Sequence, residues 1–444
     1  MSPDIQNPDA QTVEALTAAG LECPVEGAPR ASWATRVARD LVLGSFAPMT
    51  AGHLRILEPG GTVVEFGQAG ATPSAEIVVR DLGFYRRCAV GGDIGFGEAF
   101  QDALWDTPDL PAVIAWFCAN VDRSPAMSGS ARKRLRFSLL NGASRIRHWL
   151  NRNTLSGSRS NIAAHYDLGN AFYSQWLDAT MTYSSALFES AGTPLEQAQT
   201  AKYERLAREL RLGPEHHLLE IGSGWGGMAS HAVRTRGCRV TTLTLSVEQA
   251  RFCRERFQRE GISDRAEVQV LDYRLARGQY DRIVSIEMLE AVGDDFLEAY
   301  CRQVQALLKP DGLFAAQFIT CPDSRHAELR RGVDWIQKHI FPGSLLLSLN
   351  RLNAAMQRTG PLHLHGLHDM GLDYSQTLRI WRERFNCSLD AIRSQGFDEK
   401  FVRTWNYYLA YCESAFLWRN ISVVQAVWTG PNNRSLMPAA PSAT

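Results

Sequence analysis

A glycine-rich turn near the middle of the chain carries the strongest chemical signal. The apolar run Leu218–Ile221 leads into Gly222-Ser223-Gly224-Trp225-Gly226-Gly227, and a helix-compatible stretch follows. Glycine lets the backbone turn sharply and approach a ligand closely, and the free N–H groups at a helix start bind carboxylate or phosphate. The spacing Gly222-x-Gly224-x-x-Gly227 also fits a dinucleotide fingerprint. The turn therefore predicts a nucleotide-containing ligand without saying which.

The strand after this turn separates the alternatives. It reads Arg239–Ser246 and ends without the acidic residue that would hold the ribose of NAD. Glu220, two residues before the first glycine, is better suited to S-adenosylmethionine (SAM). The pattern favours a methyl donor and disfavours an NAD-dependent dehydrogenase.

Further candidate residues, most of them polar, stand at the ends of the other predicted strands and in the loops around them. They are Tyr183, Ser184 and Ser185 before the sheet, then Thr244, Leu245, Ser246, Gln249, Asp272, Tyr273, Glu290, Gln317 and Ile319 after successive strands. Singly, Ser246 is a helix cap, Asp272 a turn former and Glu290 a solvated helix residue. Because ligands of α/β sheets bind beyond the carboxyl ends of the strands, the whole set favours one site.

Seven motifs in order carry a family resemblance. They are His165–Asn170, Met181–Phe188, Glu220–Gly227, Thr244–Gln249, Glu290–Gly293, Asp334–Pro342 and Tyr407–Phe416. The chain from about 160 to 430 resembles the cyclopropane-fatty-acyl-phospholipid synthases, a family of SAM-dependent lipid C-methyltransferases that includes mycolic acid cyclopropane synthase-like enzymes. The N-terminal region resembles the family's smaller lipid-associated domain more weakly.

The resemblance implies how SAM is bound. Tyr183, Ser184 and the backbone at Gly222 and Gly224 would contact its methionine portion, and Glu220 and Gly226 belong to the same loop. The ribose side would be lined by Thr244, Leu245 and Gln249, and the adenine would meet Asp272 and Tyr273. No metal is expected, because the cysteines are scattered and lack CxxC spacing.

The resemblance also implies catalytic residues and a bound bicarbonate that acts as the base. Family positions for Glu, Ile and Tyr are matched by Glu290, Ile319 and Tyr408. The family's Cys is Ser185, which keeps the backbone contact, and its His is Gln317, which still offers a donor and an acceptor. We therefore expect bicarbonate to bind, with an altered proton relay.

The implied reaction transfers a methyl group from SAM to a cis double bond of a phospholipid acyl chain. Transfer leaves a carbocation, which needs a dry, aromatic-lined pocket. Loss of a proton from the new methyl closes a cyclopropane, the leading prediction. Loss of a chain proton instead gives a methylated or methylene alkene, which a partner reductase would saturate. A non-catalytic SAM-fold protein that binds lipid is the alternative of another class.

The elements that position these residues alternate between strand and helix. Strands are predicted at 217–221, 238–245, 266–270, 280–286, 312–319 and 421–429, with helices near 227–235, 247–259 and 295–308. This predicts an α/β fold with a mostly parallel sheet. The resemblance makes it a class I SAM-dependent methyltransferase, Rossmann-like and seven-stranded, with a smaller N-terminal α+β domain. The predicted parts are a flexible tail (1–30), the lipid-associated domain (31–122), a basic linker or helix (123–159), the methyltransferase domain (160–430) and a disordered tail (431–444).

Composition and charge indicate which kinds of partner and which location to expect. Lys+Arg and Asp+Glu both number 47, so net charge gives no indication of a nucleic-acid partner. The 9 cysteines lack CxxC spacing, and neither a signal peptide nor a membrane-spanning stretch is apparent, which predicts a cytoplasmic protein. The acid-free segment 123–159 interleaves arginines with apolar residues and favours contact with an anionic membrane surface at the inner face. An interdomain helix with a solvated basic face is the alternative. A homodimer is implied by the resemblance alone.

Overall fold

The computed structural model describes residues 5–6, 32–123 and 168–437. The predicted basic segment 123–159, apart from Arg123, and most of the predicted N-terminal tail lie outside the described residues. Residues 431–437, predicted to begin a disordered tail, instead form a turn and a short 3-10 helix, η5 (Arg434–Leu436). They are held because Asn433 donates to the carbonyl of Gly312 at 3.0 Å and Arg434 pairs with Asp311 at 2.8 Å. Within the described ranges, no helix combines the length and the apolar character needed to cross a bilayer.

The chain divides into two compact units that are not contiguous in sequence. The first unit comprises residues 1–150, 331–340 and 385–420, and the second comprises 151–330, 341–384 and 421–444. This differs from the predicted boundaries, which placed 331–340 and 385–420 in the methyltransferase domain. The physical reason is packing over long sequence distances inside the first unit.

The helix α17 (Glu399–Leu417) shows this packing. Arg403 stacks over the ring of Phe100 at 4.0 Å, and Ser414 donates to the carbonyl of Pro111 at 2.9 Å. The ring of Tyr407 lies 4.6 Å from that of Trp335. The position of α17 in the sequence suggests that it belongs to the C-terminal domain. Its side chains nevertheless pack against helices from the start of the chain.

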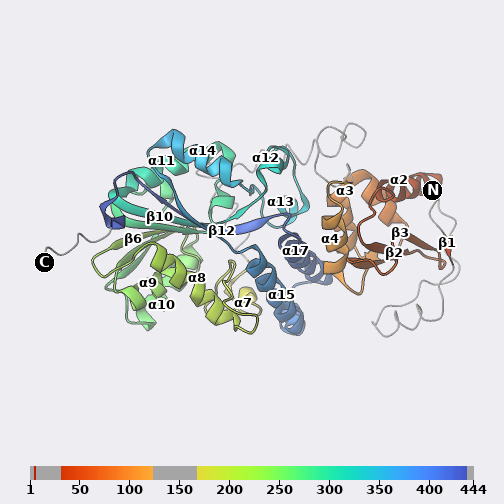
Figure 1. Cartoon of the computed structure of the whole chain (residues 1–444). Coiled ribbons are helices and arrows are strands. Elements are labelled where there is room, and N and C mark those ends of the chain that lie inside the picture. The colour runs from red at the N-terminus through yellow and green to blue at the C-terminus, as the bar shows by residue number, and fades with distance from the viewer. Residues whose placement is uncertain (1–4, 7–31, 124–167, 438–444) are drawn as a thin grey trace. The chain divides into compact units, whose positions relative to one another are not determined.

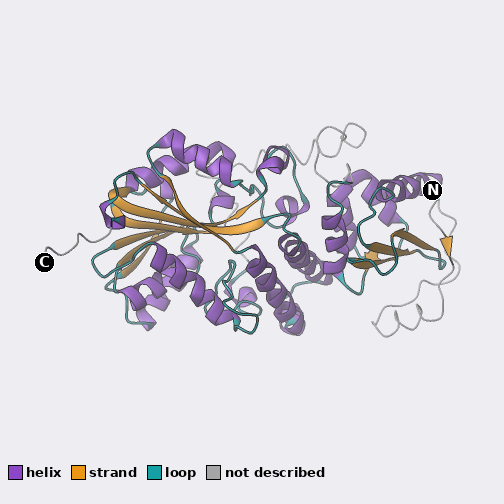
Figure 2. Ribbon diagram, viewed as in Figure 1, coloured by secondary structure: helices purple, strands orange, loops and turns teal. Residues whose placement is uncertain are grey.

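The second unit is built on a mostly parallel seven-stranded sheet, as predicted (Figures 1 and 2). The strand order is β11-β12-β10-β9-β6-β7-β8, and only the pairings of β12 with β10 and β11 are antiparallel. The strands are β6 (His217–Ile221), β7 (Arg239–Thr244), β8 (Ala266–Val270), β9 (Tyr280–Ile286), β10 (Leu308–Thr320), β11 (His363–Asp369) and β12 (Ser422–Thr429). Strand β11 was not predicted, because an edge strand need not bury an apolar face and its residues are only exposed or half-buried.

Helices cover both faces of this sheet (Figure 1). One face carries α8 (Leu195–Glu209), α9 (Gly227–Arg236) and α10 (Val247–Arg259), and the other carries α11 (Leu297–Leu307) and α14 (Leu349–Thr359). Each face has its own apolar core, one around Ile283, Phe314 and Trp428 and one around Leu218, Val240 and Phe257. Because both faces are covered, a ligand must bind at an edge of the sheet.

The first unit contains a five-stranded sheet in the order β1-β3-β2-β4-β5. Its elements are β1 (Ile5–Gln6), α2 (Trp33–Phe46), β2 (His53–Leu57), β3 (Val63–Gly67), β4 (Ser74–Val79), α3 (Gly83–Gln101), β5 (Trp105–Asp106), α4 (Leu110–Ala119) and, from later in the chain, α13 (Trp335–His339), α16 (Leu389–Ser394) and α17. The remaining helices of the second unit are α7 (Asn170–Tyr173), α12 (Asp323–Leu329) and α15 (Gly371–Cys387), the last of which runs across the unit boundary.

Candidate active site

The glycine turn connects β6 to α9 at the carboxyl edge of the sheet. Its backbone is left-handed at Gly222, Gly224 and Gly226, with φ of 99°, 48° and 82°, which explains why glycine is needed there. The N–H groups of Gly222 and Ser223 both donate to the carbonyl of Leu243 and fasten the turn to the neighbouring strand. A Cβ at Gly224 would meet no atom within 4 Å, so this part of the turn faces open space.

Glu220 is near the end of β6, two residues before Gly222, and is 2% exposed. Its Oε2 has no hydrogen-bond partner among the described residues, and burial raises the pKa of this carboxyl to about 8. A buried carboxylate oxygen without a partner is costly unless a bound group supplies the missing donor. An ammonium-bearing ligand such as SAM fits this requirement.

The loop after β7 brings together the three residues predicted for the ribose side. The Thr244 hydroxyl donates to Oε1 of Gln249 at 2.9 Å, and both side chains are buried. Ser246 caps α10 by accepting the Gln249 N–H at 3.2 Å, while Leu245 is half-buried between them. The sequence thus placed these residues correctly at the sheet edge, and their contact with ribose remains a prediction.

Asp272 and Tyr273 follow β8, as predicted, but Asp272 already has a strong partner. Its carboxylate accepts from Nε and Nη2 of Arg274 at 2.8 and 2.6 Å. Tyr273 packs edge-on against Tyr300 with ring centroids 5.2 Å apart. Their contact with adenine stays a prediction.

Aromatic rings surround Tyr183. The ring centroids of Tyr173, Trp176 and Trp381 each lie 5.4 Å from that of Tyr183. Tyr173, Trp176 and Trp381 are fully buried, so these rings form a dry aromatic wall beside the loop that continues into Ser184 and Ser185. Such a wall excludes water and can stabilise a cation through the ring faces.

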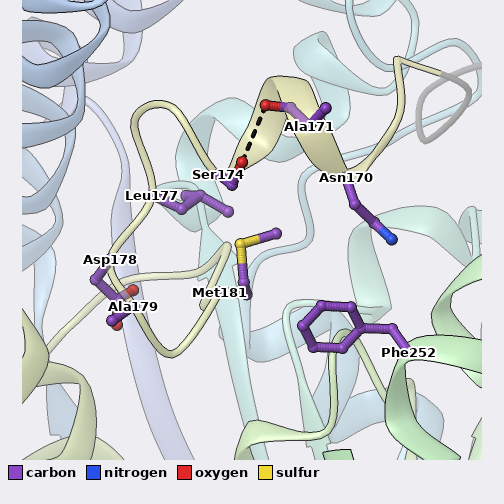
Figure 3. A pocket seen from close by; sticks show the side chains of 8 residues that line it. All are labelled: Asn170, Ala171, Ser174, Leu177, Asp178, Ala179, Met181 and Phe252. Atoms are coloured by element: carbon purple, nitrogen blue, oxygen red, sulfur yellow. Dashed lines mark hydrogen bonds between the residues drawn. The ribbon is translucent and has the colours of Figure 1, made fainter. Parts of the chain in front are cut away.

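A cavity of the second unit lies against α7 and the loop that follows it (Figure 3). It is lined by Asn170, Ala171, Ser174, Leu177, Asp178, Ala179, Met181 and Phe252. Asn170 links it to the turn, because its Oδ1 accepts the indole N–H of Trp225 at 2.8 Å. The motif around Asn170 therefore supports the cofactor turn from the side.

Glu287 is the functional candidate that sequence reasoning missed. It follows β9 directly and is only half-buried, and its carboxylate accepts three hydrogen bonds of 2.8 Å, from the Ser185 N–H, from Nε2 of Gln317 and from the Tyr374 hydroxyl. Its backbone is left-handed, with φ of 48°, which costs a non-glycine residue on the order of 1 kcal/mol. The sequence signal was the pair Glu287 and Glu290 one helical turn apart at a strand end.

The two departures from the family pattern, Ser185 and Gln317, are both fully buried and meet at Glu287. Gln317 also donates to the Ser185 carbonyl at 3.2 Å, and its Oε1 accepts from Gln425 at 3.0 Å. The Ser185 hydroxyl donates to the Ala186 carbonyl at 2.9 Å. Together these bonds fix the orientation of the Gln317 amide, so that its N–H side faces the carboxylate.

Lys202 of α8 adds a positive charge to this region. Its side chain is fully buried, and its Nζ donates to the Ser184 hydroxyl. Burial lowers the pKa of Lys202 to about 7, and the charges of Glu287 and Asp178 oppose that change. Burial raises the pKa of Glu287, while Lys202 and its three donors pull the pKa back down.

Glu290 lies within the 3-10 turn η3 (Leu289–Ala291) that follows β9. One carboxylate oxygen accepts the N–H of Ile319, and the other, Oε2, is sealed from solvent without a partner among the described residues. Burial, and then the nearby charge of Glu287, raises the pKa of Glu290 to about 8. Glu290 and Ile319 are thus together, as predicted, and burial favours the neutral form of Glu290.

Tyr408 lies on α17, in the first unit, and is 3% exposed. Its ring packs edge-on against Trp405 with centroids 5.5 Å apart. Its predicted place next to Glu290 therefore remains a prediction. In the described part of the chain, no cluster of three or more His, Cys, Asp or Glu residues is arranged to hold a metal ion.

The fold and this edge of the sheet define a class I SAM-dependent methyltransferase. A family model described as "Mycolic acid cyclopropane synthetase" matches residues 154–426, and the chain belongs to that family. The cofactor is accordingly SAM, as the turn predicted.

Individual relatives agree with this assignment. The chain is 36% identical over 401 residues to the tuberculostearic acid methyltransferase UfaA1 of Mycobacterium tuberculosis, covering 86% of this chain and 88% of the relative. It is 34% identical over 367 residues to the cyclopropane-fatty-acyl-phospholipid synthase of Escherichia coli, covering 81% and 89%. The solved structure of the cyclopropane synthase MmaA2 from M. tuberculosis matches with a TM-score of 0.57 at 28% identity, over 61% of this chain and 97% of that one. The mycolic acid cyclopropane synthase CmaA1 complexed with SAH and CTAB gives 0.56 at 28% identity, over 61% and 97%.

Proposed function

We propose that this enzyme transfers the SAM methyl group to the cis double bond of an unsaturated phospholipid acyl chain and that the product is a cyclopropane. The observation that carries the proposal is the carboxylate pair Glu287 and Glu290 beside the aromatic wall around Tyr183. Methylation of an alkene generates both a cation to be shielded and a proton to be removed. The names of the relatives from M. tuberculosis and E. coli support a lipid acceptor.

The chemistry explains why such surroundings are needed. SAM supplies an electrophilic methyl carbon when it is bound. The alkene is a weak nucleophile, so the acyl chain must be held in line with that carbon, and its π electrons form the new C–C bond. The resulting cation would be captured by water unless rings such as Trp176 and Trp381 keep the site dry.

A second product follows from the same cation. If the base reaches a chain proton rather than a proton of the new methyl, a methylated or methylene alkene results, and a partner reductase would then be required for a saturated branch. The observation that favours this alternative is the likeness over 88% of the relative named tuberculostearic acid methyltransferase. The position of the base relative to the acyl chain decides between the two products.

We also propose that the enzyme works peripherally at the cytoplasmic face of the membrane. The segment 123–159, which apart from Arg123 is outside the described residues, carries the basic and apolar residues expected for an anionic surface. Flotation with vesicles of neutral and anionic phospholipid tests this, and equal binding to both would contradict the electrostatic part. The family resemblance adds the proposal of a homodimer, which sedimentation would measure.

The central experiment incubates the enzyme with SAM and vesicles of unsaturated phospholipid. Mass spectrometry of the released esters is expected to show a gain of one CH2 unit, and NMR of the product separates ring, methylene and methyl branch. The absence of any gain, with SAM bound, would contradict the proposal and favour a non-catalytic lipid-binding protein. Glu290→Gln is expected to bind SAM normally and to lower turnover strongly, whereas unchanged turnover would remove Glu290 from the catalytic set.

A further inference from the structure

Glu287 occupies the hydrogen-bond donors that the family resemblance assigns to bicarbonate. The Ser185 N–H and the Gln317 amide stand at two of the expected positions, and both donate at 2.8 Å to Oε1 of Glu287. At a third position, the Ile319 N–H is taken by Glu290. The donors that would hold the ion are therefore already in use within the chain.

The negative charge of Glu287 also disfavours the binding of bicarbonate. A bicarbonate ion at this place would add a further negative charge next to Glu287, and repulsion between like charges is strong where water is scarce. The charge of the buried Lys202 already acts on Glu287 and lowers the pKa of that carboxyl. The residues present thus do not fit bicarbonate.

We propose that the Glu287 carboxylate is itself the base that accepts the proton from the methylated chain, in place of bicarbonate. The inference rests on the proposed function, because only a carbocation product needs such a base. Glu287 is suited to the task because its three hydrogen bonds come from donors, as an ionised carboxylate requires. Its half-buried state leaves part of the residue within reach of a ligand.

The proton transfer balances without any further reactant. In ring formation, a C–H bond of the new methyl breaks, its electron pair forms the closing C–C bond, and the proton goes to an oxygen of Glu287. In the alternative outcome the C–H bond lies on the chain, and its electron pair forms a new double bond. In both cases Glu287 becomes a neutral carboxylic acid and releases the proton to solvent before the next turnover.

The test compares wild type with Glu287→Gly and Glu287→Gln in CO2-free buffer and after addition of sodium bicarbonate. Glycine is the informative replacement because its backbone accepts φ of 48° without strain and it removes the carboxylate that accepts from the three donors. Glutamine fills the same space but is not basic. Sodium chloride at equal ionic strength controls for salt, and SAM binding together with the melting temperature controls for folding.

Wild type is expected to turn over equally with and without bicarbonate. Both variants are expected to lose at least about 100-fold in kcat, the range of general-base catalysis. Bicarbonate should restore part of the activity of Glu287→Gly and none to Glu287→Gln. A wild-type enzyme that stops without bicarbonate, or a Glu287→Gly variant that keeps full turnover in CO2-free buffer, would overturn the inference.

A second readout does not depend on activity. Titration with ¹³C-labelled bicarbonate, followed by NMR, is expected to show saturable binding to Glu287→Gly and none to wild type. Saturable binding to wild type would overturn the inference even if no lipid were methylated. Absence of methylated lipid with the expected NMR result would instead contradict the proposed function alone.

Discussion

Replacing Glu290 by glutamine is expected to change how the stability of the second unit depends on pH. The pKa of Glu290 is raised from its ordinary value of 4.5 to about 8 by burial and by the charge of Glu287. The folded state therefore binds this proton more tightly than the unfolded state does. Its stabilising effect is fully present below pH 4.5 and is lost as the pH rises through 8.

The magnitude follows from the same two values. From 4.5 to about 8, at about 1.4 kcal/mol for each tenfold change in proton affinity, the loss is at most roughly 5 kcal/mol. Glutamine stays neutral at every pH, and its Oε1 can still accept the Ile319 N–H. The variant should thus match wild type near pH 5 and exceed it near pH 8.5. Lys202 is present in both proteins, so its own titration cancels from the comparison to first order.

The assay is thermal unfolding of wild type and Glu290→Gln across this pH range, followed by circular dichroism. For a unit of this size, each kcal/mol moves the melting temperature by about 2 to 4 °C, so a gain of up to roughly 10 to 20 °C at pH 8.5 is expected. Glu248→Gln, which removes an exposed carboxylate from α10, is the matched control and should shift both ends of the range equally. Parallel curves for wild type and Glu290→Gln would refute the buried, neutral state of this carboxyl.

Two glycine substitutions test close packing in each unit. Gly227→Ala would place a Cβ 2.5 Å from the Tyr203 hydroxyl, so a destabilisation of roughly 1 to 3 kcal/mol is expected in thermal unfolding, partly relieved by Tyr203→Phe. Gly97→Ala would place a Cβ 2.5 Å from the Trp335 ring and should cost a similar roughly 1 to 3 kcal/mol, whereas Gly91→Ala on the same helix meets nothing within 4 Å and should cost little. Equal melting temperatures for the two alanine variants of α3 would contradict this packing.

The core of the second unit was predictable because its signals are local. The strands predicted at 217–221, 266–270 and 280–286 coincide with β6, β8 and β9. The segment 266–270 alternates apolar with polar residues, 217–221 and 280–286 are rich in apolar residues, and the glycine turn marks the cofactor edge. The residues around that edge could be found from their position after a strand alone.

The role of Glu287 could not be predicted from local sequence signals. Its partners Ser185, Gln317 and Tyr374 come from three distant segments, and their meeting depends on the strand order of the sheet. The left-handed backbone at Glu287 could not be predicted either, because this conformation is expected at glycine and not at glutamate. Likewise, the place of α17 depends on contacts with Phe100 and Pro111, far upstream in the chain.

The split sequence of the first unit has a consequence for synthesis on the ribosome. Helices α3 and α4 emerge early, but α17, which packs on them, is made only after nearly all of the second unit. At the usual elongation rates this interval is on the order of tens of seconds. During that time the surface around Phe100 and Trp105 is not covered by α17. The nascent chain is therefore expected to depend on chaperones until α17 has been synthesised.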